Sequence, residues 1–245
     1  ASIHMLAELQ TPAISGRNRQ LDLGHRTDAV QNIINAFLLV YAALFPIVNP
    51  IGSAPLFLRM TRGRSAAERS VLALNVAFNS FFLLLGSLFI GSHVLEFFGI
   101  TLPVVRIAGG MVVAAFGWQL LHAPEALDAD RPKVDTPGPS IDAFYPLTMP
   151  LTVGPGSMSV AMTLGSQRPT PSEDLAQLTV LGGAAIAGLA AIALTIFVSY
   201  RFADRIIAFL GKRGTDVVMR LSAFILFCIG IQIIWNGCSV LFGKV

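Results

Sequence analysis

Three prolines interrupt an otherwise apolar stretch at residues 45–58, which reads FPIVNPIGSAPLFL. A proline inside a helix removes a backbone donor and clashes with the carbonyl four residues earlier, at a cost of roughly 3 kcal/mol or more. In a soluble protein this stretch would indicate a loop. Here it lies in an apolar window, 31–58, that is long enough to cross a membrane. The stretch therefore predicts a membrane-spanning helix that is broken partway.

Composition supports a membrane environment for the whole domain. Hydrophobic residues make up 54% of the 245 residues and charged residues only 13%, whereas soluble domains are about a quarter charged. The weakly charged windows that reach the length of a span are 31–58, 71–95, 103–122, 143–166, 175–200 and 217–242. We therefore expect one transmembrane domain at 31–245, after a flexible polar tail at 1–30 that lacks the apolar core of a signal peptide. Residues 1–4, before Met5, are compatible with a cloning remnant.

The break has a counterpart in the second half of the chain. When FPIVNPIGSAP at 45–55 is placed over YPLTMPLTVGP at 145–155, all three prolines coincide. Arg106 similarly falls over Arg220 when the third and sixth windows are compared. Two halves with three spans each enter the membrane from opposite sides. The predicted fold is thus an all-α membrane protein with six transmembrane helices in two inverted three-helix repeats, about 31–122 and 143–245, joined by a loop at 123–142, with helices 1 and 4 broken at mid-membrane.

Basic residues indicate an orientation. Loops on one side carry ten of them and the other side carries five, including three in the tail. The ten are Arg59, Arg62, Arg64, Arg69, Arg131, Lys133, Arg201, Arg205, Lys212 and Arg213. The positive-inside rule then places both termini on the non-cytoplasmic side. If 31–58 and 143–166 were re-entrant hairpins, the charge sum would reverse, so this alternative stays open.

The breaks are the candidate functional site. We expect the first half-helix to end near Pro46–Asn49 and the next to start at Pro55, and we expect 154–157 to open the matching half-helix in the second repeat. Two helix starts that converge offer free N–H groups to an anion, and carbonyls freed by proline suit an ammonium group or cation, so a small zwitterion satisfies both. The predicted substrate-binding residues are Asn49, Pro50, Gly52, Ser53, Thr152, Gly154, Pro155, Gly156 and Ser157. The competing interpretation is ordinary kinks repaired by serine and threonine hydroxyls.

Other polar residues have weaker signals. Asn75, Asn79, Arg106 and Arg220 are candidates for support or gating, although interhelical hydrogen bonds explain the asparagines and snorkelling explains the arginines equally well or better. No Asp, Glu, Lys or His falls in the middle of a window, so no buried carboxylate relay is visible. The chain also lacks the side chains of a serine–histidine or metal-dependent intramembrane enzyme. We therefore expect no enzyme activity, no metal, no cofactor and no nucleic-acid partner.

Several motifs together resemble the MarC family of integral membrane proteins. They are FPIVNPIGSAPLFL, RIAGGMVV with the downstream GWQLL, PLTMPLTVGPGSMS, and RLSAF with IGIQIIWNG, and the match runs from about residue 33 to 243. The resemblance implies six spans, the inner membrane and movement of small neutral amino acids such as glycine or alanine. The leading hypothesis is a secondary transporter in contact with membrane lipid, with export, proton or sodium coupling and oligomeric state left open. The alternatives are a passive channel for small solutes and a non-transporting membrane scaffold.

Overall fold

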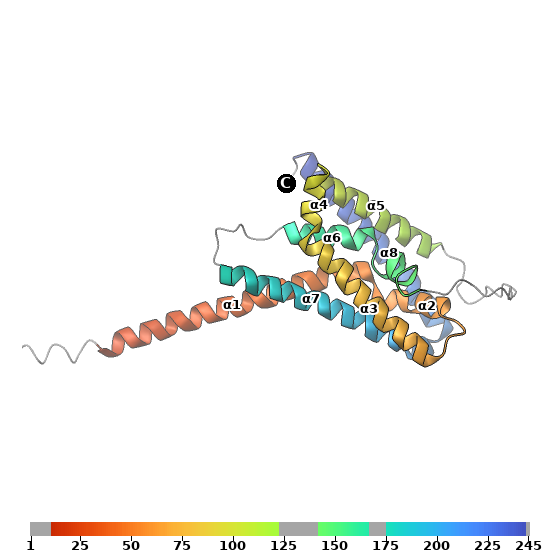
Figure 1. Cartoon of the computed structure of the whole chain (residues 1–245), viewed down its shortest axis with the longest axis horizontal. Coiled ribbons are helices and arrows are strands. Elements are labelled where there is room, and N and C mark those ends of the chain that lie inside the picture. Colours follow the sequence, from red (N-terminus) through yellow and green to blue (C-terminus); the bar gives the residue numbers. More distant parts are fainter. Residues whose placement is uncertain (1–10, 123–141, 167–174, 244–245) are drawn as a thin grey trace, which may run out of the picture.

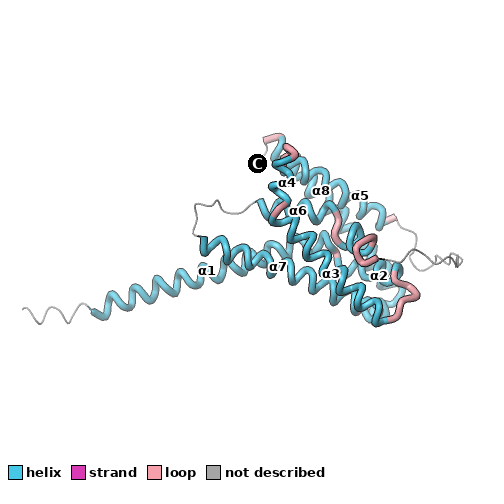
Figure 2. The backbone as a smooth tube through the Cα atoms, in the orientation of Figure 1, coloured by secondary structure: helices cyan, strands magenta, loops and turns pink. Residues whose placement is uncertain are grey.

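The computed structural model describes residues 11–122, 142–166 and 175–243, and every regular element in these ranges is a helix (Figures 1 and 2). The elements are α1 (Thr11–Val48), α2 (Pro50–Met60), α3 (Ala66–Phe89), α4 (Gly91–Phe97), α5 (Leu102–Leu121), the π-helical turn η1 (Leu147–Thr152), α6 (Pro155–Ser166), α7 (Leu175–Arg201) and α8 (Ala203–Leu241). The all-α class is confirmed. The loop predicted at 123–142 lies outside the described residues except for Asp142, as do Arg131 and Lys133.

Among the residues that the structure describes, five helical segments are long and apolar enough to cross a membrane. They are Val30–Val48, Ala66–Phe89, Leu102–Leu121, Thr179–Arg201 and Arg213–Leu241. At most 39% of any of these segments is buried inside the protein, and large apolar side chains such as Phe78 stand exposed on them. Such extensive apolar exposure on every span suits hydrocarbon rather than water as the surrounding medium.

The fourth predicted window, 143–166, forms no span-length helix. It is divided into η1 and the 12-residue helix α6, which is only about 18 Å long at 1.5 Å per residue. Proline-rich sequence explains the division, because Pro146 and Pro150 lack the N–H groups that a continuous helix needs.

Helix α1 begins inside the segment that the sequence predicts as a tail. It starts at Thr11 and continues without interruption to Val48, and its first half projects away from the other helices (Figure 1). Residues 1–10, which include the remnant expected at 1–4, lie outside the described residues.

Helices at equivalent places in the two halves run antiparallel. In α5 and α8, a side-chain Cβ built on Gly117 would meet Phe227, and one built on Gly237 would meet Ile107. Since the end of α5 thus lies near the middle of α8 and its start near the end of α8, the two directions are opposed. The ion pair between Arg69 at the start of α3 and Asp204 just after α7, at 2.9 Å, gives the same relation for α3 and α7.

The remaining contacts fix α1 beside α7. The Tyr41 hydroxyl of α1 lies 3.1 Å from Thr195 Oγ1 of α7. Earlier on both helices, a Cβ built on Gly188 of α7 would lie 3.1 Å from the carbonyl of Phe37 in α1. Both contacts advance together along the two helices, so α1 and α7 run parallel.

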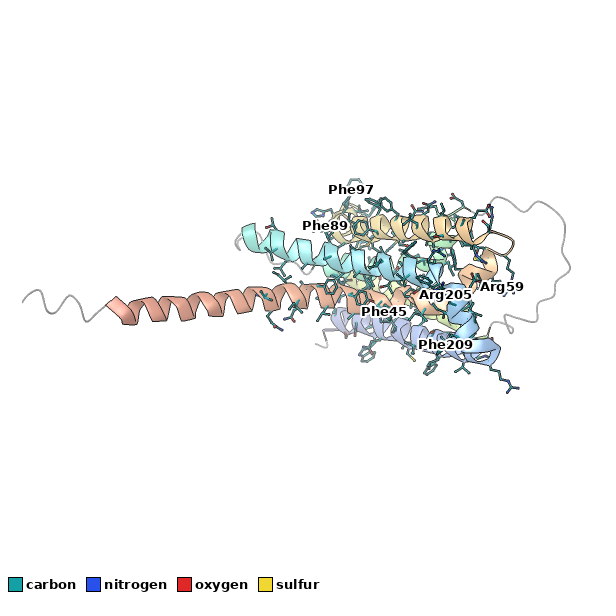
Figure 3. The ribbon with its side chains drawn as sticks, turned by 90° about the horizontal axis from the view of Figure 1, so that it is seen from below. Phe45, Arg59, Phe89, Phe97, Arg205 and Phe209 are labelled. Carbon is teal, nitrogen blue, oxygen red and sulfur yellow. The ribbon has the colours of Figure 1, made fainter. Side chains whose placement is uncertain are left out.

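One end of the bundle is rich in arginine. Arg59 at the end of α2 and Arg205 at the start of α8 lie there, whereas Phe89 and Phe97 lie toward the other end (Figure 3). Arg168 and Lys244, which entered the predicted charge balance, lie outside the described residues.

Candidate functional site

The first break is a single residue in a left-handed conformation. Asn49 has φ 47° and ψ 55°, and it separates the last residue of α1, Val48, from the first residue of α2, Pro50. Asparagine tolerates this region better than other residues with a side chain, and its Oδ1 accepts a hydrogen bond from the N–H of Gly52 at 3.2 Å. The predicted end of the first half-helix near Pro46–Asn49 is confirmed.

The predicted start of the second half-helix at Pro55 is wrong. α2 starts five residues earlier, because Asn49 supplies the turn and the cap, and Pro50 takes the first helical position, where its missing N–H costs nothing. Pro55 is accommodated inside α2. Gly52 has a packing reason, since a Cβ there would overlap the capping amide of Asn49.

The second break is longer and less regular. Within η1, Met149 is extended at φ −114° and ψ 122°, and Val153 after it is also extended. α6 then starts at Pro155, as the sequence predicts. The Ser157 hydroxyl accepts a bond from the Gly154 N–H at 3.1 Å and lies 2.9 Å from the Gly154 carbonyl. α2 begins at Pro50, whereas α6 begins at Pro155, which aligns with Pro55. In the alignment of the prolines the two helix starts therefore differ by five residues.

Threonine hydroxyl groups donate hydrogen bonds to backbone carbonyls around the second break. Thr148 Oγ1 donates to the Ala143 carbonyl and Thr152 Oγ1 to the Leu147 carbonyl, each at 2.7 Å. Both threonines are fully or almost fully buried. These two carbonyls therefore have hydrogen-bond donors within the protein, as the interpretation of ordinary kinks predicts. They are not available to bind the cation or ammonium group that the sequence analysis considered.

A tyrosine on a third helix joins the two breaks. The buried Tyr200 hydroxyl lies 2.8 Å from Thr152 Oγ1, and the Ser53 side chain of α2 lies near the same hydroxyl. Its ring stacks on Phe57, with centroids 4.4 Å apart. The sequence did not indicate Tyr200, because a tyrosine beside Arg201 near the end of an apolar window reads as an interfacial anchor.

A small cavity of about 70 Å³ opens beside the second break. Its lining includes Thr152 and the four residues of 154–157, and these are five of the nine predicted site residues. From the first break only Ile47 reaches it. The cavity lining does not include the other four predicted residues, Asn49, Pro50, Gly52 and Ser53. The Asn49 side chain accepts the Gly52 N–H instead, and Ser53 lies near the Tyr200 hydroxyl.

The cavity meets the open end of α6. Pro155 has no N–H, and the Met158 N–H donates to the Gly154 carbonyl at 3.1 Å. Within the part of the chain that the structure describes, the N–H groups of Gly156 and Ser157 have no hydrogen-bond acceptor. A helix start carries about half a positive charge together with such free donors. This wall of the cavity can therefore bind an anionic oxygen.

The four support candidates separate into two that face polar partners and two that are exposed. Asn79 Nδ2 lies 3.5 Å from Thr148 Oγ1, at the limit of a hydrogen bond, and Arg106 Nε donates to Thr163 Oγ1 at 3.4 Å. Asn75 and Arg220 are exposed.

In the described residues no group of three or more His, Cys, Asp or Glu side chains could hold a metal ion.

Long apolar helices, two interrupted helices and antiparallel packing of equivalent helices define a multi-pass α-helical membrane protein. Comparison with known proteins gives the same class: residues 34–242 match the family described as MarC family integral membrane protein. The inner membrane protein MarC of Escherichia coli strain K12 is 32% identical over 213 residues, which cover 84% of this chain and 95% of that protein. The inner membrane protein MarC of Shigella flexneri gives the same values. The chain belongs to the MarC family. No solved structure matches it.

Proposed function

We propose that this protein is a secondary transporter of small neutral amino acids, of the glycine and alanine type, and that the substrate binds at the cavity beside the second break. The observation that carries the proposal is the pair of unpaired N–H groups, of Gly156 and Ser157, at the start of α6 in the wall of this cavity. They supply two donors for a carboxylate without any cationic side chain.

The size of the cavity favours a small substrate. A water molecule needs roughly 10–15 Å³ on the same measure, so a cavity of about 70 Å³ accepts about five to seven groups of that size. Glycine and alanine have about five and six non-hydrogen atoms, and leucine has about nine. The lining is otherwise apolar, with Val112, Val113, Phe116 and Leu226, which suits a short aliphatic side chain.

Broken helices beside a small site are a recurrent arrangement in secondary transporters. Antiparallel packing of α5 with α8 and of α3 with α7 supports an inverted repeat, in which α6 and the segment before it form the fourth crossing. The relatives' name, inner membrane protein MarC, supports the same membrane for this chain, and the arginine-rich end of the bundle (Figure 3) favours a cytoplasmic face there with both termini opposite.

Transport of labelled alanine and glycine into vesicles that contain the purified protein tests the proposal. We expect saturable transport above that of empty vesicles, driven by a proton or sodium gradient. A rate that rises linearly with concentration and ignores every ion gradient would instead establish the passive channel. No transport, together with no thermal stabilisation by any small amino acid, would leave the scaffold as the explanation.

The Gly154→Leu variant tests the position of the site. A Cβ on Gly154 lies in ordinary contact, 3.6 Å from the Pro150 carbonyl, so the leucine enters the cavity without breaking the backbone. We expect transport to be lost while the protein still folds. Gly183→Leu on α7 is the matched control, because a Cβ on Gly183 meets nothing within 4 Å, and this variant should transport normally.

A further inference from the structure

A second and larger cavity lies beside the first. It has a volume of about 510 Å³, is open on one side, and is lined by α1, α5, α6 and α8. Apolar side chains make up most of the lining, and the polar ones are Arg106, Thr163, Asn236 and Ser239. Of all residues that line the two cavities, only Ile47 belongs to both. Ile47 is in the last turn of α1, two residues before the left-handed Asn49, so a small change at this break would move it.

Arg106 is the one cation among the described residues that line this larger cavity. Its Nε donates to Thr163 Oγ1, and among the described residues no acidic side chain pairs with it. A guanidinium group has five N–H donors in a planar fork that matches a carboxylate. Arg106 is half-buried near the start of its span, and an arginine without an acidic counter-ion within a membrane protein commonly marks a substrate pathway.

The helix ends around the cavity divide into two charge types. Arg106 is in the first turns of α5, whose start carries a partial positive charge. Ser239 and Val240 are in the last turn of α8, whose end carries a partial negative charge. These two ends lie side by side because α5 and α8 are antiparallel: a Cβ on Gly237 would lie 3.2 Å from Arg106 Cβ. A carboxylate beside Arg106 and an ammonium group beside the end of α8 fit this arrangement.

We propose that the Arg106 cavity is a separate binding site for the carboxylate of a small zwitterionic amino acid, ahead of the cavity at the breaks, and that Ile47 closes the passage between them. This inference rests on the proposed function for the identity of its ligand. A lipid phosphate is the other anion that could reach the cavity, and the polar groups at the end of α8 favour the zwitterion.

Transport kinetics test the role of Arg106. In Arg106→Gln we expect the KM for alanine to rise about tenfold, as for loss of a charge-assisted contact, while kcat stays within about threefold. Arg106→Lys keeps the charge and should restore most of the affinity. Arg220→Gln is the matched control, since Arg220 aligns with Arg106 in the repeat but is exposed and lines neither cavity. Equal KM values in Arg106→Gln and Arg220→Gln would overturn the inference.

A second readout does not depend on transport. A cysteine at Ser239, introduced after Cys228→Ala and Cys238→Ala remove the two free thiols, reports on the cavity through its rate of modification by a water-soluble thiol reagent. Alanine should slow this rate when Arg106 is present and leave it unchanged in Arg106→Gln, and alaninamide, which lacks the carboxylate, should not protect. Protection by alanine without any transport would support this binding site and refute the proposed transport function. Transport without protection would support the transport function and refute this binding site. Protection that follows the phosphatidylglycerol content of the vesicles and not alanine would assign the cavity to lipid and overturn the inference.

Discussion

The Tyr200 hydroxyl lies 2.8 Å from Thr152 Oγ1 and connects the end of α7 to the second helix break. The same side chain contacts α2, where its ring stacks on Phe57 and its hydroxyl lies near Ser53, so Tyr200 touches the helices on both sides of the pair of breaks. Thr152 also lines the small cavity. The position of α7 is therefore linked to the shape of the candidate substrate site.

Removal of this hydroxyl should affect transport more than stability. Tyr200→Phe keeps the stacking on Phe57 and loses the hydrogen bond to Thr152, worth about 0.6 kcal/mol on average within a membrane. We expect a modest drop in the unfolding midpoint and a clear loss of alanine transport. Tyr41→Phe is the control, because it removes the bond to Thr195 between α1 and the same helix α7. Equal transport rates in the two variants would show that Tyr200 does not position the site.

Asn49 should act through its conformation and cap rather than through a substrate contact. Asn49→Ala removes the bond to Gly52, which costs about 1 kcal/mol. Alanine also lacks the polar side chain with which asparagine offsets the steric cost of the left-handed region, about 1–2 kcal/mol for an ordinary residue. Asn49→Gly removes the cap but accepts φ 47° without strain.

The free energy of unfolding of the two variants separates these contributions. The glycine variant should lie between the wild type and the alanine variant, and its KM for alanine should match that of the wild type. If the glycine variant is stable but its KM rises strongly, Asn49 contacts the substrate and the structural role is insufficient.

The close packing of α5 on α8 gives a third prediction. A Cβ on Gly230 would overlap the backbone of Ala114, so Gly230→Ala must push the helices apart, at a cost of about 1–3 kcal/mol. Gly182→Ala on α7 is the control, because a Cβ there meets nothing within 4 Å and alanine favours a helix by about 1 kcal/mol. Thermal unfolding in detergent should show a lower midpoint for Gly230→Ala and an unchanged or higher one for Gly182→Ala. The reverse order would contradict the antiparallel contact.

Apolar windows and proline spacing were sufficient to predict the helical class, the approximate position of both breaks, and five of the six predicted spans as helices of spanning length. Periodic apolar sequence and helix-breaking residues act locally, so they can be read without tertiary information. The start of α2 was misplaced because Asn49 and Pro50 together form a cap and first turn, which outweighs the preference of Pro55 for a helix start. The extent of helix before Val30 was missed because polar sequence gives no apolar signal.

The composition of the site depended on contacts between distant residues. The alignment of the prolines suggested that the two breaks contribute equally, yet 154–157 line the cavity and Asn49, Gly52 and Ser53 do not. The sequence alone does not reveal this asymmetry between the two breaks. The asymmetry arises from tertiary contacts of Ser53 and Thr152 with Tyr200 on α7. Arg106 and Arg220 look equivalent in the repeat, and it is the packing of α5 against α6 that brings Thr163 to Arg106.

The central claim is that a small amino acid binds in the cavity beside the second break. Its most direct test is the rate of thiol modification of Gly154→Cys in the background that lacks Cys228 and Cys238, measured with and without alanine. Gly154 lines the cavity and has room for a Cβ; Ser159→Cys, buried on the same helix but outside the cavity, is the control. The account predicts that alanine and glycine slow modification at position 154 in a saturable manner while leucine does not, with no effect at position 159. Modification at 154 that proceeds at the same rate at every alanine concentration would contradict it.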